Sequence, residues 1–346
     1  MSYKLQIVNP LEFPAWDEKI LAFEGSSFFH SSSWARVLVE SYRFRPFYCA
    51  AFEGEEIVAA LPFMEVRDIF GRKKGVCSPF SDFCQPLYKD ENAFKKIFEF
   101  ATEIARKNRW RSLAIRGNAP FPKDEAAFSI FFRHVINLKH DENKLLKTFR
   151  KNTQRNIRKA RRGNVTVSFE KTPEALREFY RLNCLTRKRH GLPPQPMHFF
   201  TILFQCIILQ DRGIIALARI GDNVISASVF FHFGNRAYFK YGASNDRFAK
   251  LCANYLVMWD VIRYYRDKEY ATLCLGRTES QHKGLRHFKT GWGAEESIVY
   301  TCIFDVKSNI FIKIPLKTTG FYNHIFANTP LFLLKIFGDM FYKFMG

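Results

Sequence analysis

Two stretches of the chain share one pattern of apolar residues around a glycine turn. Residues 50–63 read AAFEGEEIVAALPF and residues 217–230 read LARIGDNVISASVF. Aligning Gly54 with Gly221 brings the apolar positions that follow into register. The matched pairs are Ile57 with Val224, Ala60 with Ala227 and Phe63 with Phe230. Because strand, glycine turn and strand recur in the same order, the sequence predicts two copies of one α/β unit.

Helical and strand patterns alternate in both halves of the chain. This alternation predicts an α/β (α+β) fold with two tandem units, each a mixed central sheet flanked by helices. At 346 residues the chain is long enough for two such domains. We expect a first domain over 1–140, a second over 141–304, and a tail over 305–346. The expected helices cover 91–107, 173–189 and 199–210; the expected strands cover 47–52, 57–66, 113–116, 214–220, 224–233 and 237–241; a loop is expected over 71–86.

The second half opens with a strongly basic stretch, Lys144–Gly163, which contains nine Lys or Arg. Its spacing predicts a single helix with one apolar stripe and one cationic face. The cationic face carries Lys151, Arg155, Arg158 and Arg162; the stripe carries Leu146, Phe149, Thr153, Ile157 and Ala160. Gly163 is placed to end the helix in the left-handed conformation. A merely solvated face usually mixes charge signs, so this one favours binding of a polyanion.

Overall composition points to phosphate-bearing partners. The formal net charge is +20 and the isoelectric point is near 9.6, which favours nucleic acid, nucleotide or an anionic membrane surface. The eight cysteines are scattered without metal-ligand spacing, so we expect free thiols in a reducing compartment and no metal site. The longest apolar run, 199–209, is too short to span a bilayer, and no signal-peptide core opens the sequence. We therefore expect a cytoplasmic protein.

The tail from residue 309 combines seven Phe and four Lys with a single acid, Asp339. Two interpretations remain open. One is an amphipathic helix lying on an anionic membrane, which would make the protein peripheral at the inner face of that membrane. The other is a helix that covers the hydrophobic flank of a domain.

Standard catalytic motifs are missing: there is no nucleophile elbow, P-loop, zinc-protease His pair or dinucleotide fingerprint. The pyrophosphate loop of acetyltransferases, [QR]-x-x-G-x-[GA], is matched only in part, at residues 72–75 and 281–284. Cys77 and Arg286 occupy its last position. Because a small residue there lets the backbone approach a phosphate, the departures weigh against acyl-coenzyme A binding by the usual loop.

Several short motifs are informative only as an ordered set. Taken singly each is more often structural, because Trp and Phe fill cores and buried tyrosines bond internally. As a set, from Ser26 to Tyr300, the sequence resembles the FemAB family of aminoacyl transferases, a branch of the acetyltransferase (GNAT) superfamily. The matching motifs are W-A-R at Trp34–Arg36, R-N-I-R-K-A-R-R-G at Arg155–Gly163, R-H-G-L at Arg189–Leu192, Y-G-A-S at Tyr241–Ser244 and F-K at Phe288–Lys289.

The resemblance implies an enzyme that moves an aminoacyl group from aminoacyl-tRNA to an amine of a peptidoglycan precursor, without a bound cofactor. It implies that Arg36, beside Trp34, and Arg189 hold phosphates of a nucleotide- or lipid-linked acceptor. Lys289, beside Phe288, would contact the donor and support the charge of the transition state, and Tyr241 and Tyr255 would position the acceptor. Fixed cations suit both tasks, and an activated ester needs positioning more than a strong nucleophile.

The sequence departs from the family where carboxylates often stand. Residues 115–118 read IRGN without an acid, and Cys274-Leu275-Gly276 replaces D-x-G. No general base is therefore named, and a polysaccharide amine stays open as an acceptor. An acyl-coenzyme A dependent N-acyltransferase and a non-enzymatic RNA- or membrane-binding protein remain the alternatives.

Overall fold

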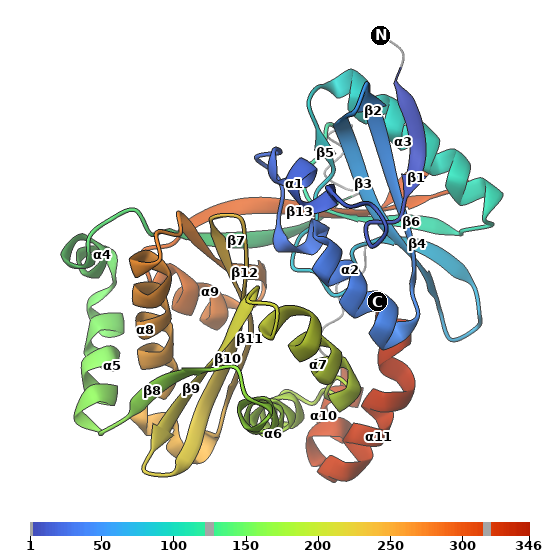
Figure 1. Cartoon of the computed structure of the whole chain (residues 1–346). Helices are drawn as coiled ribbons and strands as arrows, with labels where there is room; N and C mark the ends of the chain where they lie inside the picture. The colour runs from blue at the N-terminus through green and yellow to red at the C-terminus, as the bar shows by residue number, and fades with distance from the viewer. Residues whose placement is uncertain (1–2, 122–127, 314–319) are drawn as a thin grey trace. The chain divides into compact units, whose positions relative to one another are not determined.

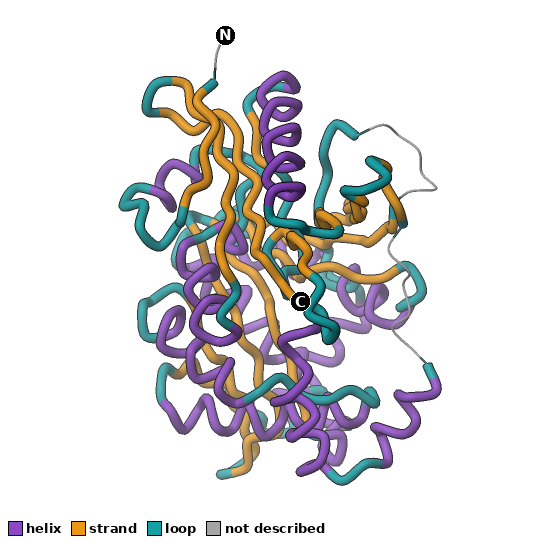
Figure 2. Tube along the Cα trace, turned by 90° about the vertical axis from the view of Figure 1, so that its right-hand side faces the viewer, coloured by secondary structure: helices purple, strands orange, loops and turns teal. Residues whose placement is uncertain are grey.

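The computed structural model describes residues 3–121, 128–313 and 320–346, and divides into two compact units. The first comprises residues Met1–Phe131, Ile298–Leu316 and Phe341–Gly346, and the second Phe132–Ser297 and Lys317–Met340. Figure 1 traces the chain, and in Figure 2 helices flank the strands of both units. The α/β class with mixed sheets flanked by helices is confirmed. The domain boundaries at 140/141 and 304/305 stay a prediction.

The sheet of the first unit has the strand order β1-β2-β3-β4-β6-β13, with β5 beside β3 and β14 beside β13. Neighbours are antiparallel except β4 and β6, which are parallel. The strands are β1 (Lys4–Val8), β2 (Arg45–Glu53), β3 (Glu56–Arg67), β4 (Lys73–Cys77), β5 (Leu87–Tyr88), β6 (Ser112–Arg116), β13 (Glu295–Asp305) and β14 (Ile310–Ile312). The helices are α1 (Trp16–Leu21), α2 (Ser32–Tyr42) and α3 (Glu91–Lys107), with short 3₁₀ turns at Phe28–His30 and Tyr342–Met345.

The interior residues of β3 are buried on both sides, because helices cover both faces of this sheet. The helix α3 begins where Asp90 accepts a hydrogen bond from the backbone N–H of Ala93 at 2.8 Å. Its buried stripe, including Ile97 and Ala101, recurs every three or four residues and packs on β2 and β3. These local signals explain why the predicted helix 91–107 is confirmed to the residue.

The sheet of the second unit has the order β8-β9-β10-β11-β12-β7. Strands β8 to β11 are antiparallel in succession, and β12 is parallel to β11. The strands are β7 (Ser129–Asn137), β8 (Thr166–Glu170), β9 (Gly213–Ile220), β10 (Asn223–Phe233), β11 (Arg236–Ser244) and β12 (Thr272–Glu279). The helices are α4 (Glu142–Thr148), α5 (Lys151–Arg162), α6 (Pro173–Arg189), α7 (Met197–Leu203), α8 (Ala253–Asp267), α9 (Lys283–Thr290), α10 (Phe321–Asn328) and α11 (Leu331–Phe341), with a π-helical turn at Phe204–Ile208 and a 3₁₀ turn at Asp246–Leu251.

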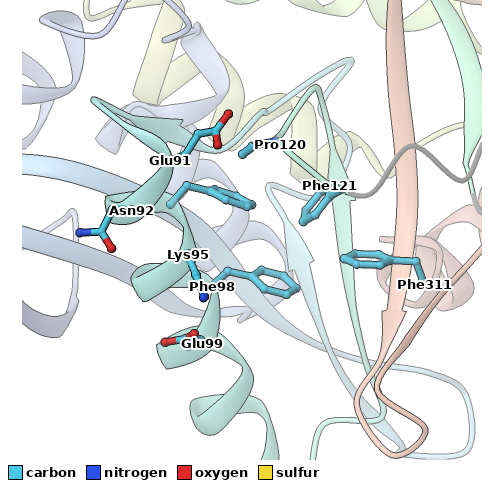
Figure 3. A pocket seen from close by; sticks show the side chains of 9 residues that line it. Glu91, Asn92, Lys95, Phe98, Glu99, Pro120, Phe121 and Phe311 are labelled. Carbon is cyan, nitrogen blue, oxygen red and sulfur yellow. The ribbon is translucent and has the colours of Figure 1, made fainter.

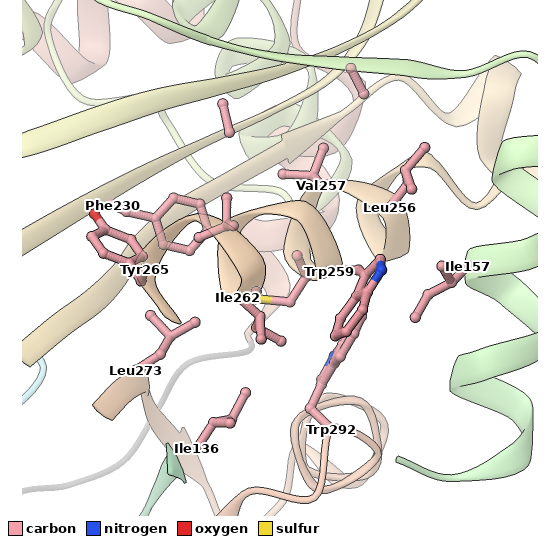
Figure 4. Close-up of a cluster of buried hydrophobic side chains, with 14 of the residues drawn as sticks. Ile136, Ile157, Phe230, Leu256, Val257, Trp259, Ile262, Tyr265, Leu273 and Trp292 are labelled. Atoms are coloured by element: carbon pink, nitrogen blue, oxygen red, sulfur yellow. The ribbon is translucent and has the colours of Figure 1, made fainter. Parts of the chain in front are cut away.

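In the second unit α5 and α8 lie on one face of the sheet and α6 and α7 on the other (Figure 1). The core on the α8 face is built around large aromatic rings (Figure 4). Phe149 packs edge-on against both Trp259 and Trp292, with ring centroids 5.5 and 5.2 Å apart. Ile157 of α5 is buried in the same cluster, so the basic helix is anchored by its apolar stripe.

The predicted glycine repeat corresponds to equivalent hairpins, β2–β3 and β9–β10. Gly54 and Gly221 both have positive φ, +61° and +53°, which glycine adopts without strain. The matched apolar pairs are all buried. The repeat is therefore confirmed as a duplicated strand–turn–strand element.

Three expectations need correction. The stretch Lys144–Gly163 is two helices, because the extended conformation of Phe149 breaks it while placing the ring in the core. Gly163 ends α5 at φ −81°, and the left-handed residue is Asn164 at φ +54°. The loop 71–86 contains a strand, β4, because residues 73–77 pair with β3 and β6, which are distant in sequence.

Candidate active site

The two parallel strands of the second unit, β11 and β12, pair near their starts. The strands β11 and β12 pair over Arg236–Tyr238 and Thr272–Cys274, and both continue beyond that pairing. A register shift between Val229 and Phe230 on β10 marks a bulge opposite, in β11. Because the strands are parallel, their carboxyl ends lie at one edge of the sheet, where α/β proteins commonly bind ligands.

Lys289 reaches the end of β12 from the helix α9. Its side chain is 3% exposed, and its Nζ donates a hydrogen bond to the carbonyl oxygen of Arg277 at 2.9 Å. Burying an ammonium is costly, so a cation placed here suggests a functional demand. Thr278, next to Arg277 and also buried, has a hydroxyl without a hydrogen-bond partner among the described residues.

Phe288 points from α9 toward α8. Its ring lies 5.2 Å from that of Tyr255 and 6.0 Å from that of Trp292, both edge-on. Tyr255 is half-buried and its ring also lies 5.8 Å from Trp292. Two of the predicted site residues, Phe288 and Tyr255, are thus in contact, and Lys289 follows Phe288 in the sequence.

A charged network that the sequence analysis missed joins β7 to α9 and β13. The side chain of His134 is fully buried, and its Nε2 lies 3.0 Å from Oε2 of Glu296. Arg286 donates from Nε to the same oxygen at 2.6 Å, and its guanidinium stacks 3.8 Å above the ring of Phe132. Nδ1 of His134 has no hydrogen-bond partner among the described residues.

Electrostatics fixes the charge state of this network. Burial, assisted by the positive charge of Lys289, lowers the pKa of His134 below its ordinary value, although Glu296 opposes the shift. The hydrogen bond from Arg286 lowers the pKa of Glu296. At neutral pH the network therefore combines the neutral imidazole of His134, the carboxylate of Glu296 and the guanidinium of Arg286.

The other predicted residues of this unit lie near β11. Gln195 donates from Nε2 to the hydroxyl of Tyr241 at 3.4 Å, and the Tyr241 ring packs 5.4 Å from that of Phe200. Tyr241 therefore contacts the α7 side of the sheet, whereas Tyr255 contacts the α9 side. Arg189, at the end of α6, is exposed and forms an ion pair with Asp246, just after β11.

The cationic face of α5 is exposed as predicted. Thr153, Ile157 and Ala160 are buried on the opposite side. Its four predicted cations are Lys151, Arg155, Arg158 and Arg162. The start of α5 adjoins α9, because Nη1 of Arg150 lies 2.6 Å from Nδ1 of His287. The cationic face and the buried ammonium of Lys289 thus belong to neighbouring helices.

Trp34 and Arg36 belong to the first unit, on α2. Trp34 is fully buried, and its ring lies 5.4 Å from that of Phe29, so it is part of the core. Arg36 is half-exposed and lies 3.7 Å from Glu40 in a helical ion pair. Their role in substrate binding stays a prediction.

The first unit also has a hollow of about 560 Å³ beside α3 (Figure 3). Aromatic rings form much of its wall; those of Phe121 and Phe311 lie 4.6 Å apart. It is lined by Glu91, Asn92, Phe94, Lys95, Phe98, Glu99, Pro120, Phe121 and Phe311. None of the predicted site residues lines this hollow.

Two further features are absent from the part of the chain that the structure describes. Within it, no three His, Cys, Asp or Glu side chains are grouped to hold a metal ion. None of the helices described is both long and apolar enough to cross a bilayer.

Comparisons with known proteins identify the fold. The family model "Acetyltransferase (GNAT) domain" matches residues 147–284. The structure is similar to that of FemX, with a TM-score of 0.69 and 14% identity over 86% of this chain and 96% of that one. No curated protein matches the sequence.

Two further solved structures share the fold. A tandem GNAT protein from the clavulanic acid biosynthesis pathway has a TM-score of 0.51 and 12% identity, over 88% of this chain and 99% of its own. The C-terminal domain of a protein from Agrobacterium fabrum, named a lysylphosphatidylglycerol synthetase, has a TM-score of 0.54 and 14% identity, over 82% and 89%. The predicted tandem GNAT-like fold is confirmed, and the FemAB-like resemblance is confirmed at the level of the fold: residues 147–284 match the GNAT acetyltransferase domain, which supports an acyltransferase, and the chain has the fold of FemX.

Proposed function

We propose that this protein transfers an aminoacyl group from aminoacyl-tRNA to an amine of a cell-envelope precursor. The observation that carries the proposal is the buried ammonium of Lys289, held 2.9 Å from the carbonyl of Arg277 at the end of β12, with the cationic helix α5 beginning beside α9. A fixed cation suits a developing oxyanion, and a cationic helix suits a nucleic acid donor. The likeness to FemX agrees with this chemistry.

In the proposed reaction the acceptor amine attacks the ester carbonyl of the donor. The new C–N bond forms, the C–O ester bond breaks, and the proton lost by the amine passes to the departing ribose oxygen. Lys289 stabilises the oxyanion of the tetrahedral intermediate, with Phe288 beside the donor end. Because the ester is already activated, no protein nucleophile is required.

His134, Glu296 and Arg286 act as positioning residues in this proposal. The buried imidazole of His134 cannot itself touch the acceptor, but it holds Glu296 together with Arg286. This arrangement restrains α9, which carries Lys289. Glu296 also provides a carboxylate in this unit, whereas residues 115–118 and 274–276 lack the acids that the family often has there.

The acceptor side is assigned to the remaining residues. Arg189 and Arg36 bind phosphates of a nucleotide- or lipid-linked precursor, and Tyr241 and Tyr255 position its amine. Trp34 supports Arg36 from the core of α2. A peptidoglycan precursor is the first choice of acceptor and a polysaccharide amine the second. Such an enzyme would work in the cytoplasm, at the inner face of the membrane where lipid-linked precursors are made.

An acyl-coenzyme A donor is the second candidate, because the matching family model is described as an acetyltransferase. Neither partial pyrophosphate motif supports it strongly. Gly75 of the first motif is packed so closely that an added Cβ would lie 2.4 Å from the Trp110 ring, which leaves no room for a phosphate. The second motif runs into α9, which contains its Gly284, and ends on Arg286, which is bonded to Glu296.

The test is to supply purified protein with each donor class in turn. Aminoacyl-tRNA labelled in the amino acid, and acyl-coenzyme A labelled in the acyl group, would each be incubated with a nucleotide-linked peptidoglycan precursor and with an amino-polysaccharide. We expect label to move to an acceptor from the tRNA donor. Transfer from the coenzyme A donor alone would overturn the proposal in favour of the second candidate.

A further inference from the structure

The C-terminal helices α10 and α11 form a hairpin in the second unit. The rings of Phe326 on α10 and Phe337 on α11 lie 5.8 Å apart and join the two helices. Pro330 immediately precedes α11, where its fixed φ favours a helix start. The hairpin is thus a defined element with an inner and an outer side.

The inner side of the hairpin is docked on the end of α6 and the segment after it. Asn323 donates from Nδ2 to the carbonyl oxygens of His190 and Gly191, at 3.3 and 3.1 Å. Gly338 of α11 is buried, and a Cβ added there would lie 2.0 Å from the carbonyl oxygen of Pro194. This close approach fixes which side of α11 faces the protein.

The outer side of α11 is apolar and exposed. Phe332, Ile336 and Met340 recur every four residues and are 63%, 49% and 57% exposed, and Leu333 lies beside them. We call these four residues the outer face of α11. Besides these side chains α11 carries Lys335 and an exposed carboxylate, Asp339. Because several large apolar side chains are exposed together on one helix, the outer face is an interaction surface.

Cations lie at the end of α6, where the hairpin docks, and on α11 itself. The last turn of α6, on which α10 docks, carries Arg187, Lys188 and Arg189. Lys335 of α11 lies over the ring of Tyr180, with its Nζ 5.5 Å from the ring centroid. An exposed apolar helix face in a unit that also carries these cations matches the interfacial region of a bilayer that contains anionic lipids.

We propose that the outer face of α11 inserts into the surface of an anionic lipid bilayer. Charge decides between this partner and a second copy of the chain. The formal net charge of +20 attracts the protein to an anionic surface, but makes two copies repel. This inference does not depend on which group the enzyme transfers.

The experiment measures binding of the full-length protein to vesicles by flotation. One set contains phosphatidylcholine alone and the other also contains phosphatidylglycerol. We expect wild type to bind the anionic vesicles, and Phe332→Glu/Ile336→Glu to bind them at least about tenfold more weakly, because two apolar side chains no longer insert. The control, Ile69→Glu/Phe70→Glu, replaces the same residue types at exposed positions of the first unit and changes the charge equally. It should bind within about threefold of wild type.

Circular dichroism and thermal melting would establish that both variants fold. Equal binding by the α11 variant and the control would overturn the proposal. So would wild-type protein that ignores anionic vesicles and instead forms a dimer, detected by sedimentation, that the α11 variant disrupts. Donor turnover with a water-soluble acceptor should not change in either variant, which separates loss of docking from failure of the proposed transferase reaction.

Discussion

The two units share a strand order but end their parallel strand pairs differently. In the first unit, the carbonyl oxygen of Arg116 at the end of β6 accepts a hydrogen bond from the backbone N–H of Cys84 at 2.6 Å. In the second, the carbonyl oxygen of Arg277 on β12 accepts one from the ammonium of Lys289. One strand end is thus met by backbone, and the other by a buried charge.

Internal packing completes the closure of the first unit. Glu65 is buried on β3, accepts a hydrogen bond from Nε1 of Trp110 at 2.8 Å and pairs with Lys73 at 3.2 Å. Gly117, just after β6, lies so close to Gln85 that an added Cβ would be 2.4 Å from its Cα. The comparison teaches that a duplicated fold can close a strand end with backbone in one copy, while the other copy holds a buried charge at the corresponding place.

Replacing Lys289 is the strongest way to break this comparison. Lys289→Met preserves most of the buried volume but removes the charge. We expect turnover to fall by about 10²- to 10³-fold, the usual effect of losing one preorganised oxyanion donor. The measurement is kcat for aminoacyl transfer, with circular dichroism to establish folding.

The matched control for Lys289→Met lies at the corresponding strand end of the first unit. Cys84→Ala leaves its backbone N–H in place, so the bond to Arg116 persists and turnover should stay near the wild-type value. If both substitutions reduced kcat equally without unfolding the protein, the functional difference between the two strand ends would be wrong.

The close packing around Gly117 in the first unit predicts the next largest effect, which is on the free energy of unfolding. Gly117 has φ +153° and no space for a side chain, so Gly117→Ala should reduce the free energy of unfolding by about 3 kcal/mol through strain and overpacking. Gly284 of α9 has no neighbour near an added Cβ, so Gly284→Ala should stabilise by about 0.5 kcal/mol through helix propensity. Urea denaturation measures both; equal effects would contradict the packing described at Gly117.

How much was predictable from sequence follows from where each signal lies. The helix 173–189 is confirmed exactly because its start is local: Thr172 accepts a hydrogen bond from the backbone of Ala175, and Pro173 follows. The strand β4 was missed because its partners are distant in the chain. The break at Phe149 was missed because two tryptophans, Trp259 and Trp292, draw its ring inward, which overrides helical periodicity.

The same distinction applies to the site. The F-K motif indicated Lys289 as a candidate site residue, because the two residues of the motif are adjacent in sequence. The pair of His134 and Glu296 is separated by 162 positions, and a single His in an apolar strand carries no motif. Arg286 had a weak signal, as the residue that spoils the Q-x-x-G-x-[GA] pattern, but its partner could not be inferred.

The cationic face of α5 gives a smaller expected effect. Arg155→Ala/Arg158→Ala should weaken tRNA binding by about tenfold and reduce the salt slope of log affinity by about two, because two phosphate contacts are lost. Lys171→Ala/Arg177→Ala is the matched control in the same unit, since these exposed cations already pair with Asp211 and Glu174. Filter binding across a salt series measures both variants.

An equal loss in the Lys171→Ala/Arg177→Ala control would mean that general charge, rather than the α5 face, attracts the donor. If the α5 variant kept its affinity for tRNA, the cationic face of α5 would not be the tRNA-binding surface.

The smallest expected effect is a pH dependence confined to the second unit. The folded-state pKa of His134 is lowered, so the unfolded state binds the proton more readily. The stabilising contribution is therefore complete above the ordinary histidine pKa of about 6.5 and is lost as pH falls from there toward the folded value. His134→Gln should flatten the decline in the free energy of unfolding between about pH 7.5 and 5. It should also alter the pH profile of kcat, because His134 positions Glu296 beside Arg286.

His232 serves as a control that separates the effect on stability from the effect on the pH profile of kcat. Burial also lowers its pKa, but its Nε2 bonds the carbonyl of Asp211 at 2.6 Å and its Nδ1 lies 3.3 Å from the hydroxyl of Tyr265, in contacts that involve no predicted site residue. His232→Gln should therefore flatten the pH dependence of stability while leaving the pH profile of kcat unchanged. Urea denaturation and initial rates over the same pH range measure both. If His134→Gln changed stability alone, as His232→Gln should, the buried network around Glu296 would be structural, and Lys289 would act without it.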